Sequence, residues 1–285
     1  MRKAYSAVEL VVVIAIMAVL IGLLLGAVQK VRRTATRLQS INHIKQNNLA
    51  VLHYVGNYKH YPVLGGANQS MEEAPVFVAM LPYLDQDNYY KEWVKNNGVG
   101  GSQSADVKCY LSPADPSGDL YLNRTSYAFN GCLLRWKQPL TPMEITDGTS
   151  NTIHFVERYS FGCSANGFFG NDWHLMDNFV VQMVQDGVNR VFARGATVGI
   201  ERTGDAVPVS SGTPRVTVSS IPGVFFQVAP TMAGCEPRGA QTPHQSGMLV
   251  GLADGSVRTL SKGTNESGYM GLLTPKSDDY AGETD

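Results

Sequence analysis

Residues 1–30, MRKAYSAVELVVVIAIMAVLIGLLLGAVQK, decide how the rest of the chain is organised. The run 10–28 contains 19 residues without a charge, and a helix of that length spans roughly 28 Å, about the thickness of a bilayer core. We therefore predict a membrane-spanning helix. One acid, Glu9, borders the run, although a carboxylate entering a membrane helix costs roughly 3 kcal/mol. The nearest basic residues are Arg2, Lys3, Lys30, Arg32 and Arg33.

The residues alone leave the purpose of this segment open. A plain signal-anchor helix would hold Glu9 at the level of the lipid headgroups. A cleaved secretory signal is disfavoured, because the apolar run is too long and no A-x-A-like cleavage site is clear after it.

The segment resembles the N-terminal signature of type IV prepilins, in which a short basic leader and a small residue precede an aromatic residue and then a Glu. The resemblance implies that residues 1–4 are the leader, that a prepilin peptidase cuts after Ala4, and that it methylates the amine of Tyr5. Ala4 stands where Gly is usual, and Tyr5 where Phe is usual. Glu9 is then the fifth mature residue, implied to set the register of assembly by pairing with the N-terminal amine of a neighbouring subunit.

The helix is predicted to continue beyond the membrane. Apolar residues recur at helical spacing from Val28 to Val55, and Tyr61-Pro62 indicates where the helix has ended. We expect a helix from Tyr5 to about Tyr58, on the order of 80 Å long. Its transmembrane and assembly half is 5–30, and its amphipathic half, 31–60, packs on a globular domain.

Composition favours a loop-rich β domain after this helix, because the chain has 29 Gly and 14 Pro. The net charge of −1 argues against a nucleic-acid partner. Asp-Gly pairs between apolar runs predict hairpins at 147–148, 186–187 and 254–255. Short helices are expected at 74–85 and 88–95, and strands at 125–131, 179–185, 188–194, 207–209, 215–219, 224–228, 248–253 and 256–260. The predicted fold class is α+β, with the long helix packed on an antiparallel β-sheet head domain at 61–285.

Several further segments together resemble one family of bacterial pseudopilin-like proteins with a domain of unknown function. They are SINHIKQNNLAVLHYVGNYKHYP, MLPYLDQDNYY, ITDGTSNTIHFVE and HQSGMLVGLADGSVRTL. The motif residues in the last two are Asp147, Gly148, Thr149, Ser150, Asn151, His244, Asp254 and Gly255. The resemblance implies a pilin-like plan in which residues 159–235, which match least, form a large β-rich variable insertion.

No catalytic site is predicted. If Asp254-Gly255 is a two-residue turn, His244 lies opposite about Asn265, and ten strand residues put it roughly 33 Å from the turn. Only a sharp bend near Gly247 would bring His244 and Asp254 together. Ser150 lacks the G-x-S-x-G context of a hydrolase nucleophile.

Several other polar and aromatic residues are considered as candidate binding sites. Glu157 and Arg158 are interpreted as a surface pair at a strand end. Asp147 and Asn151 offer oxygen ligands for calcium, but no EF-hand loop is present, and turn hydrogen bonds are the alternative. We therefore predict no metal and no cofactor, with calcium as the weaker candidate. Two interpretations are open for five aromatic residues, a glycan-binding site and a place in the hydrophobic core. The residues are Tyr89, Tyr90, Trp93, Trp136 and Trp173.

The four cysteines leave disulfide formation open. None forms a C-x-x-C pair, which argues against a zinc or redox motif. An exported domain forms up to two disulfides from four cysteines, in three possible pairings. The residues concerned are Cys109, Cys132, Cys163 and Cys235.

The predicted function is a non-enzymatic, pseudopilin-like structural subunit of a type II secretion or type IV pilus-like filament. Its expected partners are a prepilin peptidase, other pilin-like subunits with their assembly machinery, and the lipid bilayer. Its expected location is the bacterial inner membrane, with a cytoplasmic N-terminus and an extracytoplasmic head, and a filament or the cell surface after assembly. The alternatives are a monomeric, membrane-anchored binding module for a glycan or other ligand and, less favoured, an anchored enzyme.

Overall fold

A computed structural model of the chain describes residues 7–62, 74–96, 107–117, 124–133, 139–161, 180–185, 188–193, 197–198, 226–235 and 239–276. The mixture of helices and antiparallel strands confirms the predicted α+β fold class. The strands expected at 207–209 and 215–219 lie outside the described residues, as do Trp136, Trp173 and Cys163.

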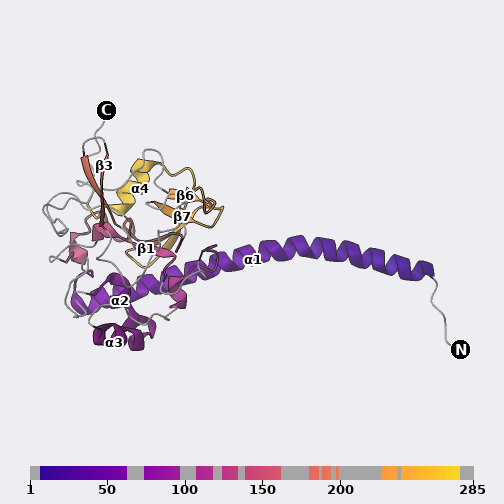
Figure 1. Cartoon of the computed structure of the whole chain (residues 1–285), viewed down its shortest axis with the longest axis horizontal. Helices are drawn as coiled ribbons and strands as arrows, with labels where there is room; N and C mark the ends of the chain where they lie inside the picture. The colour runs from indigo at the N-terminus through magenta and orange to yellow at the C-terminus, as the bar shows by residue number, and fades with distance from the viewer. Residues whose placement is uncertain are drawn as a thin grey trace.

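The first element, α1 (Ala7–Tyr58), is a continuous helix of 52 residues and confirms the predicted long N-terminal helix. Figure 1 shows its first half projecting from the head, whereas its second half lies against the head. The helix ends where Lys59 adopts a left-handed conformation, with φ of 66°, and donates its backbone N–H to Val55 O at 2.8 Å. A left-handed residue just past the last turn is a common helix stop.

The central sheet has the strand order β5-β1-β2-β8-β9. Its strands are β1 (Tyr127–Asn130), β2 (Ile153–Glu157), β5 (Thr197–Val198), β8 (Met248–Leu252) and β9 (Val257–Leu260). All neighbours pair antiparallel except β5, which runs parallel to β1. Two smaller sheets pair β3 (Val180–Gln185) with β4 (Val188–Ala193), and β6 (Phe226–Val228) with β7 (Ala240–Thr242).

Alternate side chains of the central sheet enter two hydrophobic cores. One face, with Phe129, Phe155 and Leu249, packs in the core that contains Ile44 and Tyr54 of α1. The other face contributes to a core closed by the helix α4 (Glu266–Leu273), whose Tyr269 and Leu273 are buried there. The sheet therefore lies between α1 and α4, as Figure 1 shows.

Helix α4 was not predicted from the sequence. Its residues ESGYMGLL include two glycines, which disfavour a helix. Burial of Tyr269 and Leu273 against the sheet stabilises the helix in spite of this local preference.

Short helical elements pack beside the second half of α1. They are α2 (Val76–Met80), η2 (Leu81–Leu84) and α3 (Asp87–Lys95), in the regions where short helices were predicted. Trp93 of α3 is buried, and Tyr89 and Tyr90 pack partly buried against the same core. Trp93 is therefore a core residue, and Tyr89 and Tyr90 lie at the edge of the same core. The remaining short helices are η3 (Lys108–Tyr110), η4 (Gly131–Leu133) and η5 (Pro142–Glu144).

Of the three hairpins predicted from Asp-Gly pairs, two are confirmed and one is wrong. Pairing of Gln185 with Val188 confirms the hairpin between β3 and β4. The hairpin between β8 and β9 is also confirmed, but Leu252 N donates to Ser256 O at 2.8 Å, so its loop has three residues rather than two. The hairpin predicted at 147–148 is wrong, because this pair leads from η5 into β2 and joins no two strands. Gly148 lies there with φ of 92°, a conformation that glycine adopts without strain.

Gly251 sets the distance between β8 and α1. A Cβ atom at this position would lie 2.5 Å from Asn48 Nδ2 and 2.6 Å from Ile44 Cγ2. We expect Gly251→Ala to lower the free energy of unfolding by about 1–3 kcal/mol, because strand and helix must separate. Gly56→Ala is the control, since no atom lies within 4 Å of its added Cβ. Chemical unfolding of both variants tests this, and unchanged stability of Gly251→Ala would contradict the close packing.

Candidate functional site

The most distinctive surface of the molecule is the bare first half of α1. Large apolar side chains from Val8 to Val31 are exposed on all sides of the helix, and Ser40 is the first fully buried residue along it. Helix α1 is long and apolar enough to cross a membrane. A helix that is apolar all round requires lipid or other helices to cover it. We refer to residues 8–31 as the bare rod.

The predicted processing and assembly residues lie at the far end of the bare rod. Ala4 and Tyr5 are outside the described residues. Glu9 lies in the first turn of α1 and is exposed. An acid in the first turn interacts favourably with the positive end of the helix dipole.

The β8–β9 hairpin holds α1 from one side. Arg37 donates from Nη1 to Gly247 O at 3.3 Å and from Nη2 to Thr259 Oγ1 at 2.8 Å. Further along the helix, Asn48 Nδ2 donates to Ser256 O at 3.3 Å. No residue near Arg37 in the sequence indicates these contacts, because its partners are more than 200 residues away.

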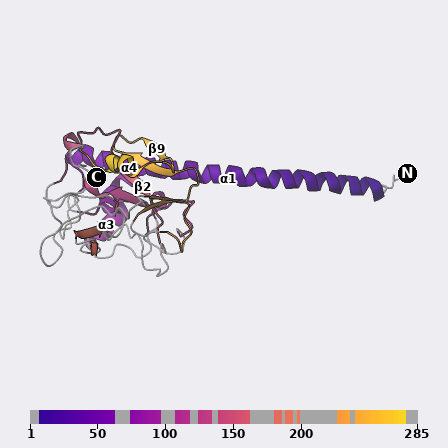
Figure 2. The same cartoon turned by 90° about the horizontal axis from the view of Figure 1, so that it is seen from above.

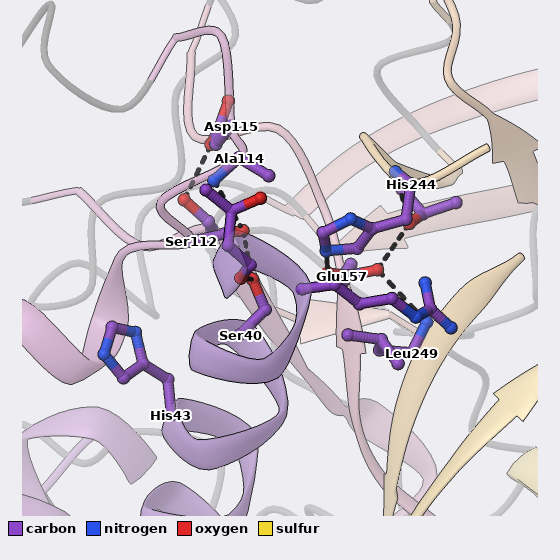
Figure 3. A network of polar contacts seen from close by, with 12 residues as sticks. Ser40, His43, Ser112, Ala114, Asp115, Glu157, His244 and Leu249 are labelled. Carbon is purple, nitrogen blue, oxygen red and sulfur yellow. Dashed lines mark hydrogen bonds and ion pairs between the residues drawn. The ribbon is translucent and has the colours of Figure 1, made fainter. Parts of the chain in front are cut away.

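The segment 109–112 holds α1 from another side. The Ser40 and Ser112 hydroxyls are 2.9 Å apart, His43 Nδ1 lies 2.8 Å from Leu111 O, and Asn47 Nδ2 donates to Cys109 O at 3.0 Å. Figure 3 shows Ser40 and His43 on the helix with Ser112 above them. The second half of α1 and the head are thus joined by buried and partly buried polar contacts as well as by apolar packing.

Asp115 ties the segment after Ser112 to the sheet. Its Oδ1 accepts from Ser117 N at 2.9 Å and from Ser117 Oγ at 2.6 Å. Its Oδ2 accepts from Ser126 Oγ at 2.6 Å and from Ser160 N at 2.8 Å. One carboxylate therefore holds the segments that precede β1 and follow β2.

Glu157 is the most deeply buried acid in the described part of the chain, which makes the predicted surface pair with Arg158 wrong. Both side chains are buried, because β2 is a central strand covered on both faces. Oε2 of Glu157 accepts from Thr242 Oγ1 and, at 3.1 Å, from Leu249 N. Oε1 lies 3.1 Å from His244 Nε2, which is ion-pair distance, although the angles do not meet hydrogen-bond geometry. Figure 3 shows this carboxylate directed at His244.

The carboxylate of Glu157 also affects two nearby phenols. Burial raises the pKa of Tyr127 well above its ordinary value, and the charge of Glu157 reinforces that shift. Burial raises the pKa of Tyr159 to about 12, with Asp115 and Glu157 adding to it. Both phenols therefore remain protonated at neutral pH, and Tyr159 donates its hydroxyl to Pro230 O at 2.9 Å.

His244 and Asp254 are not brought together. His244 was predicted to face Asn265 across the sheet, and this is wrong because the ladder stops at the pair Met248–Leu260. Gly247, with φ of 118°, turns the chain away, and its N–H donates to His244 O. Asp254 lies in the β8–β9 loop, where Oδ1 accepts from Ser256 N at 2.8 Å. Desolvation alone would raise the pKa of Asp254, but the hydrogen bonding by Ser256 and the charge of Arg258 together outweigh it and leave that pKa lowered.

The motif residues 147–151 form a hydrogen-bonded turn before β2. Asn151 Nδ2 donates to Asp147 O at 3.1 Å, and Asn151 N donates to Gly148 O at 3.0 Å. Thr149 and Ser150 are exposed at the tip, and Gly255 lies at φ of 87° in the other motif. Within the described ranges, no cluster of three or more His, Cys, Asp or Glu side chains has a metal-binding arrangement. The contacts of Asp147 and Asn151 agree with the turn interpretation.

The cysteines of the described residues divide into two kinds. Cys235 is disulfide-bonded, whereas Cys109 and Cys132 form no disulfide. Burial raises the pKa of the Cys109 thiol to about 11, so it carries little thiolate at neutral pH.

His154 gives the head a specific pH dependence. Its Nε2 lies 2.9 Å from the Tyr61 hydroxyl, and burial lowers its pKa to about 3, against a smaller opposing effect of Asp254. An unfolded histidine titrates near 6.5, so the unfolded chain binds more protons between about pH 6.5 and 3. We expect His154 to make stability fall by up to ~1.4 kcal/mol per pH unit as pH drops through that window. Chemical unfolding across the window tests this against His154→Gln, which should show a shallower loss; equal slopes would contradict it.

The chain matches a known protein family. A family model described as a protein of unknown function (DUF1559) matches residues 29–131 and 122–267. The matched residues run from the end of the bare rod through the β8–β9 hairpin to the start of α4. No curated protein and no solved structure matches the chain.

Proposed function

The chain belongs to the DUF1559 family, a family of unknown function, and on that premise we propose that it is a pilin-like structural subunit. The bare rod holds it in the bacterial inner membrane, from which it enters a type II secretion or type IV pilus-like filament. A prepilin peptidase cuts between Ala4 and Tyr5 and methylates Tyr5. In this proposal the head has no enzymatic role, and other pilin-like subunits cover the bare rod after assembly.

The observation that supports the proposal is the division of α1 into two halves. Residues 8–31 are apolar and exposed, while the same unbroken helix is buried in the head from Ser40 onward. A rod fixed rigidly to a head can be transferred from lipid to a helical bundle without refolding either part. Glu9, at the far end of the rod, then meets the Tyr5 amine of a neighbour, and such pairing makes a carboxylate tolerable in an apolar environment.

Two observations bear on the orientation of the head. The disulfide at Cys235 favours an extracytoplasmic head, because disulfides persist in oxidising compartments. The bias of Lys and Arg favours the opposite orientation, since Lys30, Arg32, Arg33 and Arg37 follow the apolar run, whereas only Arg2 and Lys3 precede it. We give the disulfide more weight, because it is a covalent consequence of the compartment rather than a statistical signal for insertion.

The second candidate function is a monomeric, membrane-anchored binding module. The same bare rod supports it, because lipid alone also covers an apolar helix. The two candidates differ in what contacts the rod in the native host.

Photo-cross-linking from the bare rod distinguishes them. We expect a photoreactive residue at Ile16, which is 56% exposed, to form adducts with other pilin-like chains. The matched position is Met143 in the head, which is 94% exposed and lies outside the rod. Protein adducts at Ile16 but not at Met143 support the subunit proposal. Adducts with lipid alone at Ile16 contradict it and favour the anchored module.

A further inference from the structure

We propose that basic residues at the base of the head form a collar that binds anionic phospholipid headgroups on the head's side of the bilayer. The collar consists of Lys30, Arg32, Arg33, Arg37 and Lys262. This inference rests on the membrane anchoring in the proposed function, but it needs neither processing nor assembly.

Three collar residues surround α1 where the apolar run stops. Lys30, Arg32 and Arg33 are exposed and lie within one helical turn, about 5 Å of helix axis. A 100° step per residue places Lys30 and Arg33 on one side and Arg32 on the opposite side. A 19-residue run before them fills the bilayer core, so these side chains reach the level of the lipid phosphates.

Arg37 fixes the distance between this ring and the head. It lies seven residues, roughly 10 Å, beyond Lys30 and donates to Gly247 O and Thr259 Oγ1 of the β8–β9 hairpin. From there β8 follows α1 away from the rod, since Gly251 lies against Ile44 and Asn48, and Gly255 against Leu52. Among the described head residues that hydrogen-bond to side chains of α1, Gly247 and Thr259 do so closest to the bare rod, so this end of the hairpin faces the membrane.

Lys262 joins the collar through the return of β9. Because Leu260 pairs with Met248, the turn that follows β9 lies at the membrane end of the hairpin. Lys262 is exposed in that turn. Figure 2 shows β9 beside α1 on the side where the rod leaves the head.

Most of the positive charge of the collar is available to bind an external partner. In the part of the chain that the structure describes, the side chains of Lys30, Arg32, Arg33 and Lys262 make no hydrogen bond or ion pair. Five positive charges gather here although the whole chain has a net charge of −1. With the head outside, they oppose the usual topology bias, so insertion does not account for them. Phosphate-bearing lipids are the anionic partner present at this depth of the membrane. Each basic residue near an anionic membrane surface raises the affinity for that surface about fivefold.

Native mass spectrometry of the full chain released from nanodiscs tests the collar. The probe lipids are phosphatidylcholine alone or mixed with phosphatidylglycerol. We expect the wild-type chain to retain phosphatidylglycerol at least tenfold over its share of the mixture. The triple variant Lys30→Gln, Arg32→Gln, Arg33→Gln should lose most of that enrichment, and Lys262→Gln alone should lower it about fivefold. The control variant Lys45→Gln, Lys95→Gln, Lys108→Gln removes the same charge from exposed positions elsewhere.

The possible outcomes distinguish a failure of the collar proposal from a failure of membrane anchoring. Enrichment that is lost in the collar variants and kept in the control supports the collar. Equal enrichment in all variants, equal loss in both triple variants, or no enrichment in the wild type overturns it and leaves the proposed function standing. A chain that does not stay in the nanodisc contradicts the anchoring, and with it the proposed function.

Discussion

Glu157→Ala is expected to lower the free energy of unfolding of the head by about 2–6 kcal/mol, because two buried donors lose their acceptor at a cost of about 1–3 kcal/mol each. The substitution leaves Thr242 Oγ1, Leu249 N and His244 Nε2 without the carboxylate that now lies among them. Each of these groups is buried, so water does not replace the lost partner. The effect should reach beyond β2, because the carboxylate connects this strand to β7, to β8 and to the segment that carries His244.

Two further variants make this prediction specific. Glu157→Gln keeps the shape and one acceptor oxygen but removes the charge, so we expect a smaller loss than with alanine. Glu92→Ala removes an acid of α3 that is only partly buried and should change stability by less than about 0.5 kcal/mol. Chemical unfolding of the three variants under one set of conditions compares them. A loss with Glu157→Ala no larger than with Glu92→Ala would show that the buried pair does not hold the sheet.

Glu9→Ala is expected to abolish incorporation of the subunit into filaments while leaving membrane insertion intact. The substitution makes the end of the bare rod more apolar, so insertion is not impaired. It removes the carboxylate that, in our proposal, meets the Tyr5 amine of the neighbouring subunit. The measurement is the fraction of subunit recovered with sheared filaments relative to the membrane fraction.

Val12→Ala is the matched control for this prediction. It trims an exposed apolar residue one turn further along the rod and leaves the acid in place. We expect near-normal incorporation. If Glu9→Ala is incorporated as well as Val12→Ala, the role assigned to Glu9 is wrong.

Local sequence patterns predicted those elements whose conformation depends mainly on residues close to them in the chain. The uninterrupted apolar run and the stripe that follows it predicted α1 as one helix, and the Asp-Gly pairs predicted two real hairpins. Gly148 shows the limit of that signal, because a positive φ is needed in many turns that join no strands.

The misread residues are those whose surroundings come from distant parts of the chain. Glu157 and Arg158 look like a surface pair in sequence, but β1 and β8 flank β2 and both faces of the sheet are covered. His244 was placed by extending the β8–β9 ladder, which stops at Gly247 instead. Arg37 was missed, although it joins rod to head, because nothing near it in sequence marks its partners.

Processing as a pilin-like subunit is tested by the mass of the N-terminus of the chain purified from the membranes of its native host with its peptidase active. We expect a chain that begins at Tyr5 and carries one methyl group on its amine. A chain that still begins at Met1 under those conditions would contradict processing as a pilin-like subunit and would leave the bare rod as a simple membrane anchor.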